Sequence, residues 1–299
     1  MIRKEREHLR IVITGLKNRL MNIRKNKKIV FVDVDGTLLN DEKKIPESAC
    51  KAIREIKEAG NLCLLCTGRN LKQTEMFDFL GLDGAVLLNG SVVYLNGEVV
   101  FEKAFPERLV SELFEYAEEV GAGLHVLTLN NIYSNDSWNK RKINFLKAGF
   151  DLSEEAFRKR ARFDTPLKLF EGETVYKIDV RFPSPEHRQK YYENLDPSLN
   201  MFIDSGYYSR GGTWYAELNH CEASKGIAVE NILRILQMDK SQAYGFGDSN
   251  NDVPMLEACG TKVVMATGTP SVREMADLVA EAADDDGIYK AVKQLGLDR

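Results

Sequence analysis

An acidic segment that directly follows a predicted strand places the strongest constraint on the fold of this chain. The apolar run Ile29–Val32 is typical of a buried parallel strand, and it leads into Asp33-Val34-Asp35-Gly36-Thr37. Residues i and i+2 of an extended chain point the same way, so we expect the carboxylates of Asp33 and Asp35 to face one small volume. The carboxyl ends of such strands are where open α/β sheets bind ligands.

This pair of carboxylates also has a chemical implication. Close carboxylates repel each other, so proteins keep them mainly where a cation neutralises them or where one stays protonated. Both conditions occur in metal-assisted and acid–base chemistry. A solvated acidic turn is the alternative, but the sequence returns to apolar character at Leu38-Leu39. A second acidic cluster, Gly247-Asp248-Ser249-Asn250-Asn251-Asp252, follows another predicted strand far along the chain.

Length, charge and cysteine content narrow the class of protein. The 299 residues suffice for a large domain and a smaller one, and the net charge of −4 gives no overall attraction to nucleic acid. The sequence has no apolar run of membrane-spanning length and no secretory signal pattern, and its five cysteines are scattered. We therefore expect a cytoplasmic protein with no membrane span and no nucleic-acid partner. Nothing in the sequence indicates an oligomeric state.

The start of the chain differs in composition from the rest. The first 28 residues contain ten basic and two acidic side chains, and apolar residues recur among them at helical spacing. A basic amphipathic helix that contacts a membrane surface or a partner is one interpretation. The apolar face is short and contains Gly15, which favours an extra helix packed on the core or a partly frayed segment. We assign residues 1–27 as a basic N-terminal extension.

Strand and helix patterns alternate in two separate parts of the chain. The first part has predicted strands over 29–32, 62–65 and 85–88 and helices over 46–59 and from about 71. The second has a strand over 243–246 that leads into the later acidic cluster, with helices before and after it. This alternation is typical of a doubly wound, Rossmann-like parallel sheet. We predict a discontinuous α/β core formed by residues 28–90 and 219–299.

The intervening residues follow a different pattern. Apolar and polar residues alternate in the strands predicted over 176–182 and 214–218, which indicates a sheet with one covered face. Asn96-Gly97 between two apolar segments is the strongest short signal for a two-residue hairpin turn. A helical pattern covers 106–120. We therefore predict an α+β module over 91–218 that is inserted into the core domain.

Four motifs together carry a family resemblance. They are Asp33-Val34-Asp35-Gly36-Thr37-Leu38, Thr67-Gly68-Arg69, Ser224-Lys225-Gly226 and the cluster from Gly247 to Asp252. Their order resembles that of the haloacid dehalogenase superfamily, specifically the Cof-like phosphatases with a large α/β cap, type IIB. Asn89-Gly90 is similar to the junction between core and cap in that branch, and Asp285-Asp286-Gly287-Ile288 to its closing motif. Met265-Ala266-Thr267-Gly268-Thr269-Pro270 departs from the usual Met-Gly-Asn-Ala loop.

The resemblance implies a magnesium-dependent phosphatase that acts on a small phosphorylated metabolite. Asp33 would attack phosphorus and become an aspartyl phosphate, while Asp35 would act first as general acid and then as general base. The implied Mg²⁺ ligands are Asp33, Asp35 through its backbone carbonyl, and Asp248, with Asp252 nearby. Thr67 and Lys225 would complete the catalytic set, and the implied substrate-binding residues are Thr67, Gly68, Asn89, Lys225 and Asn251.

Other interpretations of these residues stay open. Thr67 could cap a turn, Lys225 could be a solvated helix residue, and Asn251 could cap the helix after it. A phosphomutase acting on sugar phosphates would share the first motif and the aspartyl phosphate. A non-catalytic protein that binds a phosphorylated metabolite would keep the pocket without turnover.

Overall fold

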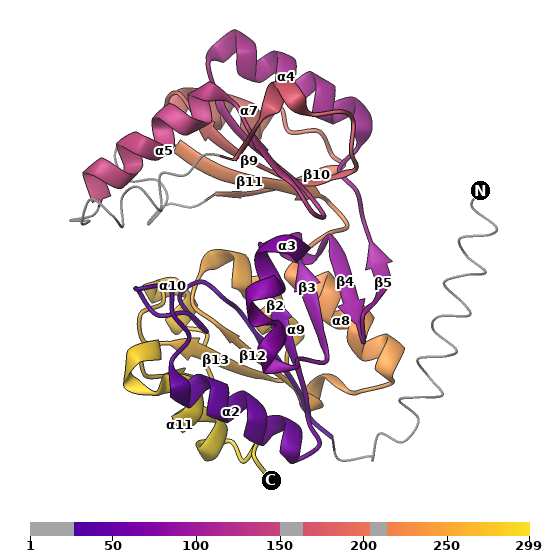
Figure 1. The fold of residues 1–299 in the computed structure, drawn as a ribbon, viewed down its shortest axis with the longest axis vertical. Coiled ribbons are helices and arrows are strands. Elements are labelled where there is room, and N and C mark those ends of the chain that lie inside the picture. Colours follow the sequence, from indigo (N-terminus) through magenta and orange to yellow (C-terminus); the bar gives the residue numbers. More distant parts are fainter. Residues whose placement is uncertain (1–26, 150–163, 204–213) are drawn as a thin grey trace, which may run out of the picture. The chain divides into compact units, whose positions relative to one another are not determined.

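The computed structural model describes residues 27–149, 164–203 and 214–299, which form two compact units (Figure 1). The unit that we call the core unit consists of the described residues up to Arg69, together with 73–102 and 224–299. The second, which we call the cap unit, consists of 70–72 and the described residues of 103–223. Apart from Lys27, the predicted basic extension lies outside the described residues.

The core unit is built on a mainly parallel sheet. Within the described residues this sheet has eight strands in the order β14-β13-β12-β1-β2-β3-β4-β5. The strands are β1 (Ile29–Val32), β2 (Leu62–Cys66), β3 (Gly84–Leu87), β4 (Val92–Leu95), β5 (Glu98–Glu102), β12 (Ala243–Gly247), β13 (Thr261–Met265) and β14 (Leu278–Ala280). The strands from β14 to β3 run parallel, and β1 lies between β12 and β2. The predicted doubly wound α/β fold is confirmed.

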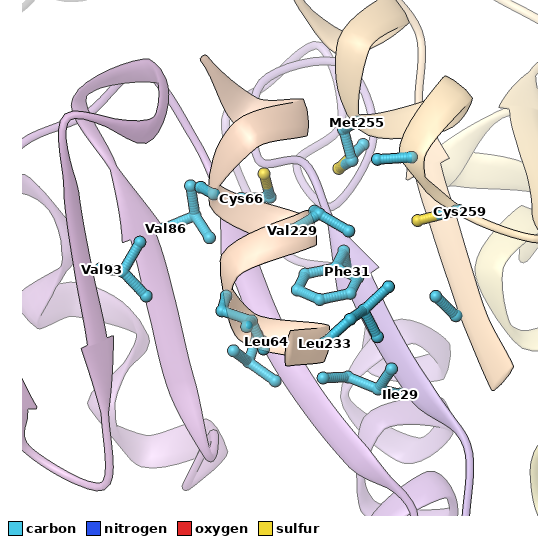
Figure 2. Close-up of a cluster of buried hydrophobic side chains, with 14 of the residues drawn as sticks. Ile29, Phe31, Leu64, Cys66, Val86, Val93, Val229, Leu233, Met255 and Cys259 are labelled. Carbon is cyan, nitrogen blue, oxygen red and sulfur yellow. The ribbon is translucent and has the colours of Figure 1, made fainter. Parts of the chain in front are cut away.

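Helices cover both faces of this sheet, which explains why β1 is apolar at every position. Ile29 and Phe31 pack in a cluster with α8 (Lys225–Leu236) and α9 (Val253–Ala258), as Figure 2 shows for Val229, Leu233 and Met255. Val30 and Val32 belong to a second cluster with α2 (Glu47–Glu58) and α11 (Gly287–Gln294). Shorter helical segments are α3 (Leu71–Thr74), η1 (Glu75–Leu80), η2 (Leu88–Gly90), η5 (Lys240–Gln242), η6 (Asn250–Asp252), α10 (Pro270–Arg273) and η7 (Ala283–Asp285).

The hairpin at Asn96-Gly97 forms as predicted, but it belongs to the core unit. β4 pairs antiparallel with β3, and β5 pairs with β4, so the hairpin extends the core sheet. Val93, Leu95 and Val100 are buried in the core cluster, and this burial accounts for the placement. The expected module boundaries at 91 and 218 were therefore wrong, because the chain leaves the core unit after Glu102 and returns to it at Ser224.

The cap unit contains its own sheet, which is largely antiparallel. Its described residues form six strands in the order β10-β11-β9-β6-β7-β8. They are β6 (Gly123–Thr128), β7 (Ile132–Ser134), β8 (Thr165–Pro166), β9 (Val175–Phe182), β10 (Leu199–Ile203) and β11 (Trp214–His220), with η3 (Leu167–Leu169) after β8. Helices α4 (Glu107–Val120) and α7 (Pro185–Glu193) pack on one face, and α5 (Asp136–Gly149) follows β7. The helix predicted over 106–120 is confirmed by α4.

The expectation that β9 is half-buried was wrong, because all eight of its residues are buried. Ile178 and Val180 lie in the apolar cluster of the cap unit, but the alternate residues Lys177, Asp179 and Arg181 are also less than a tenth exposed. The Lys177 ammonium lies 3.1 Å from a carboxylate oxygen of Asp179 and 3.1 Å from one of Glu217. Charged groups tolerate such burial when they are paired.

A histidine on the neighbouring strand β6 completes this buried polar face. His125 Nδ1 lies 2.9 Å from Asp179 Oδ2, and its Nε2 lies 3.4 Å from Asp164 Oδ2. The imidazole stacks on the indole of Trp138 with ring centres 4.7 Å apart and planes 4° from parallel. Burial alone would lower the pKa of His125, but the two carboxylates outweigh it and raise the pKa above its usual value.

No described helix has the length and apolar character needed to cross a bilayer.

Candidate active site

The two acidic segments converge because the strands before them are neighbours. β1 and β12 run parallel with Val32 opposite Phe246, and the Asp33 N–H continues the pairing by donating to the Phe246 carbonyl at 2.9 Å. Both segments therefore emerge at the same edge of the sheet. Carboxylate oxygens of Asp33, Asp248 and Asp252 all lie within 4.8 Å of one another.

The ammonium of Lys225 lies inside this acidic group. Its Nζ donates to Asp33 Oδ1 at 2.6 Å and to Asp252 Oδ1 at 2.5 Å, and the side chain is 1% exposed. Ser224 caps helix α8 by accepting from the Ile227 N–H at 3.1 Å, which sets Lys225 as the first helical residue. Burial disfavours the charge, but Asp252 and Asp33 outweigh it and raise the pKa of Lys225 well above its usual range. Lys225 is therefore a buried cation, and the solvated-helix interpretation was wrong.

Asp252 has a structural role in the loop that carries Asp248. Its Oδ2 accepts hydrogen bonds from the backbone N–H groups of Asp248 and Ser249, both at 3.0 Å, and from the Ser249 hydroxyl at 3.2 Å. Its other oxygen binds Lys225. Because both oxygens are engaged, Asp252 is suited to holding the loop and the ammonium in place. Asn251 is tied to the same loop, since its Oδ1 accepts from the Ser249 hydroxyl at 2.7 Å.

Asp248 is held by the first acidic segment. The Thr37 hydroxyl donates to Asp248 Oδ1 at 2.9 Å. Gly36 has φ +100°, and a Cβ atom there would lie 2.4 Å from Asp248 Oδ2, so both the backbone and the close approach require glycine. Burial, followed by repulsion from Asp252, raises the pKa of Asp248 to about 7, and the same two causes raise that of Asp33 well above its usual value. A divalent cation would relieve this crowding, and hard carboxylate oxygens are the ligands that Mg²⁺ prefers.

The carboxylate of Asp35 binds two cations and is not grouped with that of Asp33, contrary to what the sequence had led us to expect. Arg69 binds it bidentately, with Nε 2.8 Å from Oδ2 and Nη2 2.9 Å from Oδ1, and Lys43 Nζ lies 2.9 Å from Oδ1. Burial would raise the pKa of the Asp35 carboxyl, but Arg69 and then Lys43 outweigh it and hold that pKa far below its usual range. Asp35 is therefore ionised here, and its carboxylate is not part of the group formed by Asp33, Asp248 and Asp252.

The remaining candidates lie at the ends of β2 and β3. Thr67 is buried, its carbonyl accepts from the Asn89 N–H at 3.0 Å, and its hydroxyl accepts from the Arg69 N–H at 3.2 Å. The turn-capping interpretation of Thr67 therefore describes a contact that does form. Asn89 is buried in a left-handed conformation with φ +57°. Thr67, Gly68 and Arg69 directly follow β2, which is the neighbour of β1 in the sheet, and Asn89 follows β3, the next strand.

Sequence reasoning gave no role to Thr37 or Lys43 and left Arg69 outside the candidate set. Thr37 and Arg69 belong to the quoted motifs, and their placement after predicted strands was a usable signal. Lys43 lies in the turn after the first motif, where nothing in the sequence relates its side chain to Asp35. Contacts of this kind depend on loop conformation, which composition and periodicity do not determine.

Comparisons with known proteins agree with this geometry. A family model described as haloacid dehalogenase-like hydrolase matches residues 30–292. "Putative phosphatase YkrA" of Bacillus subtilis (strain 168) is 26% identical over 281 residues, which cover 91% of this chain and 99% of YkrA. The phosphoglycolate phosphatase of Methanothermobacter thermautotrophicus is 26% identical over 269 residues, covering 89% of this chain and 98% of that protein.

A solved structure shares the fold over nearly the whole chain. The HAD subclass IIB sugar phosphatase BT4131 superposes with a TM-score of 0.72 at 23% identity, covering 91% of this chain and 100% of that one. The motifs that suggested the resemblance occupy the edge of the sheet where Asp33, Lys225 and Asp248 meet. The chain therefore belongs to the haloacid dehalogenase-like hydrolases and is a phosphatase of their Cof-like branch.

Proposed function

We propose that this protein is a Mg²⁺-dependent phosphatase that hydrolyses small phosphomonoesters, such as sugar phosphates, through an aspartyl phosphate on Asp33. The observation that carries the proposal is the convergence of Asp33, Asp248 and Asp252 around the buried ammonium of Lys225. Support for a small substrate comes from relatives named as a phosphoglycolate phosphatase and a sugar phosphatase.

The first half-reaction transfers the phosphoryl group to the protein. A carboxylate oxygen of Asp33 forms a bond to phosphorus while the bond from phosphorus to the ester oxygen breaks. Asp35 gives a proton to the departing oxygen; because Arg69 and Lys43 hold its carboxyl ionised in this structure, Asp35 must first take up that proton from solvent. Lys225 stays charged beside Asp33 and balances the negative charge of the phosphoryl oxygens.

The second half-reaction releases phosphate and restores Asp33. Asp35, now ionised, takes a proton from a water molecule as that water attacks the phosphorus of the acyl phosphate. The bond between phosphorus and the Asp33 oxygen breaks, and the carboxylate is regenerated. Thr67, Gly68, Asn89 and Asn251 are the further groups that we propose to contact the phosphate.

The metal would be held by carboxylate oxygens of Asp33 and Asp248 together with the backbone carbonyl of Asp35. When bound, Mg²⁺ would neutralise charge between the nucleophile and the phosphate. The raised pKa values of Asp33 and Asp248 support this assignment, because they reflect a site with more negative charge than its surroundings balance. Asp252 would hold the loop that carries Asp248.

The test is phosphate release from a panel of small phosphomonoesters, with and without Mg²⁺, using Asp33→Asn as the control for contaminating activity. We expect release that requires the metal and is lost in the variant. Absence of release from every ester by folded, metal-bound protein would count against a phosphatase. Exchange between isomers that depends on a bisphosphate, without net phosphate release, would indicate a phosphomutase instead.

A further inference from the structure

The cap unit contains a cavity of about 400 Å³, a volume in the range of small-molecule sites. It is formed by one side of α4, the end of α7 and the segment that leads into β10. Leu109, Leu113 and Leu199 contribute to its lining, and each of them is less than a tenth exposed. The cavity therefore offers an apolar surface to a ligand.

Two tyrosines add an aromatic part to this lining. The rings of Tyr116 and Tyr191 have their centres 5.1 Å apart, and both residues line the cavity. The buried ring of Phe182 packs against both, at 6.5 Å from Tyr116 and 5.5 Å from Tyr191. Aromatic rings attract cations over their faces and also contact apolar groups. A cation with an apolar body would therefore suit this lining.

The charged groups of the cavity are acidic. Glu112 and Asp196 line it, and none of its described lining residues is a lysine or an arginine. Arg108 does not line the cavity but binds both carboxylates, with Nη1 2.6 Å from Glu112 Oε1 and Nη2 2.9 Å from Asp196 Oδ2. Helix α4 as a whole carries five glutamates and one arginine. The local charge thus favours a cation over an anion.

Three lining groups keep a free hydrogen-bond acceptor. Within the described residues, nothing hydrogen-bonds the Tyr191 hydroxyl or the second carboxylate oxygen of Glu112. The Asn194 amide nitrogen donates to a backbone carbonyl at 2.8 Å, which leaves its amide oxygen available. Burial raises the pKa of Tyr191, and repulsion from Asp196 and Glu112 adds to this, so both carboxylates act on its hydroxyl. An ammonium, with three donors and no acceptor, matches such groups.

We propose that this cavity binds a small primary amine that carries an apolar or aromatic group. The apolar group would lie against the leucines and tyrosines, and the ammonium would donate to Glu112, Tyr191 and Asn194. Arg108 would oppose the ligand, because it carries a like charge and already binds Glu112. None of these residues belongs to the proposed catalytic set, so binding can be measured whether or not the chain hydrolyses phosphomonoesters.

The first test compares 2-phenylethylamine with 2-phenylethanol, which has the same size but no charge. Leucine methyl NMR spectra of the full chain locate binding, because Leu109, Leu113 and Leu199 line the cavity. We expect the amine to shift these methyl signals with a dissociation constant on the order of 1 mM, as is typical of so small a ligand. The alcohol should bind about fivefold more weakly, since it lacks the partly exposed ion pair.

Matched variants test the charge with effects of opposite sign. Glu112→Gln should weaken binding of the amine about fivefold, whereas Arg108→Gln should strengthen it by a similar factor. Tyr191→Phe should weaken it about fivefold, since it removes one hydrogen bond. Glu118→Gln is the control, because Glu118 is an exposed residue of the same helix that does not line the cavity, and it should bind like the wild type.

Several outcomes would overturn the inference. Equal binding of the alcohol and the amine would show that charge has no part, and shifts confined to other leucines would place the ligand elsewhere. Changes of the same sign in Glu112→Gln and Arg108→Gln would also contradict it. Misfolding does not confuse this comparison, because the two side chains are 53% and 65% exposed and the ligand-free methyl spectra report the fold of each variant.

Discussion

The ammonium of Lys225 and the carboxylate of Asp33 form an ion pair at 2.6 Å, with side chains that are 1% and 7% exposed. A buried pair of this kind stabilises a fold little compared with apolar packing, but removing one partner leaves an uncompensated charge. The pair is therefore best understood as part of the chemistry. In the proposed mechanism it fixes one oxygen of Asp33, the nucleophile, and keeps a positive charge beside the phosphoryl oxygens.

Replacement of Lys225 should affect both stability and activity. In Lys225→Met we expect a loss of about 3 kcal/mol in the free energy of unfolding when EDTA is present, because two buried carboxylates lose their partner. Mg²⁺ should recover part of that loss, since it would neutralise Asp33, one of the two carboxylates that lose the ammonium. Urea unfolding of both proteins with EDTA and with Mg²⁺ measures this. An identical loss under both conditions would argue against a metal at this site.

The hydroxyl of Thr37 should strengthen metal binding without touching the ion, because it orients Asp248 through a 2.9 Å hydrogen bond. Thr37→Val should weaken Mg²⁺ binding about tenfold or more, as expected when a group that orients a ligand is removed. Isothermal titration of the protein with MgCl₂ provides the affinity. Thr37→Ser retains the hydroxyl and should bind close to wild-type strength, and equal weakening in both variants would contradict this role.

Gly36 and Gly97 offer a matched comparison between backbone strain and steric clash. Both have positive φ, but a Cβ atom at Gly97 would meet nothing within 4 Å, whereas one at Gly36 would overlap Asp248. We expect Gly97→Ala to cost about 1 kcal/mol of unfolding free energy and to leave phosphate release intact. Gly36→Ala should cost more and abolish release. Urea unfolding and phosphate release measure the two effects. A smaller loss of stability in Gly36→Ala than in Gly97→Ala, or intact release in Gly36→Ala, would contradict this expectation.

The stability of the cap unit should depend on the protonation of His125. Because the folded-state pKa lies above the unfolded value of about 6.5, the charged imidazole stabilises the fold fully below that pH. The contribution should disappear as the pH rises through the folded pKa. The difference in urea midpoint between wild type and His125→Gln should therefore shrink from pH 6 towards pH 9. A difference that grows with pH would show that the sign is wrong.

The sequence predicted the core sheet and the convergence of Asp33 and Asp248 because both follow from local patterns. An apolar run followed by Asp33 or Asp248 specifies a strand end, and parallel strand ends meet at one edge of a sheet. The contacts of Lys43 and the burial of Lys177 were not predictable in this way. The burial of Lys177 depends in part on Glu217, which is distant in sequence, and the contact of Lys43 depends on a turn. In the sequence, both lysines therefore look like ordinary solvated residues.

The hairpin shows the same limit at the level of whole elements. Asn96-Gly97 specifies the turn, but the partner of β4 is decided by which apolar surface covers Val93 and Leu95. Hairpin signals carry no information about the sheet that a hairpin joins. The boundary of the inserted module was therefore misplaced although its elements were identified.

The pairing of β1 with β12 has a consequence for biosynthesis. Residues 33–242 separate these strands, so a ribosome delivers most of the polypeptide before the second strand exists. Closing so long a segment costs conformational entropy, and the pairing that offsets this cost cannot form until β12 has been synthesised. Any translation product that stops before Ala243 would therefore contain Asp33, the proposed nucleophile, but would lack Asp248 and Asp252, and the acidic group would assemble only as synthesis nears its end.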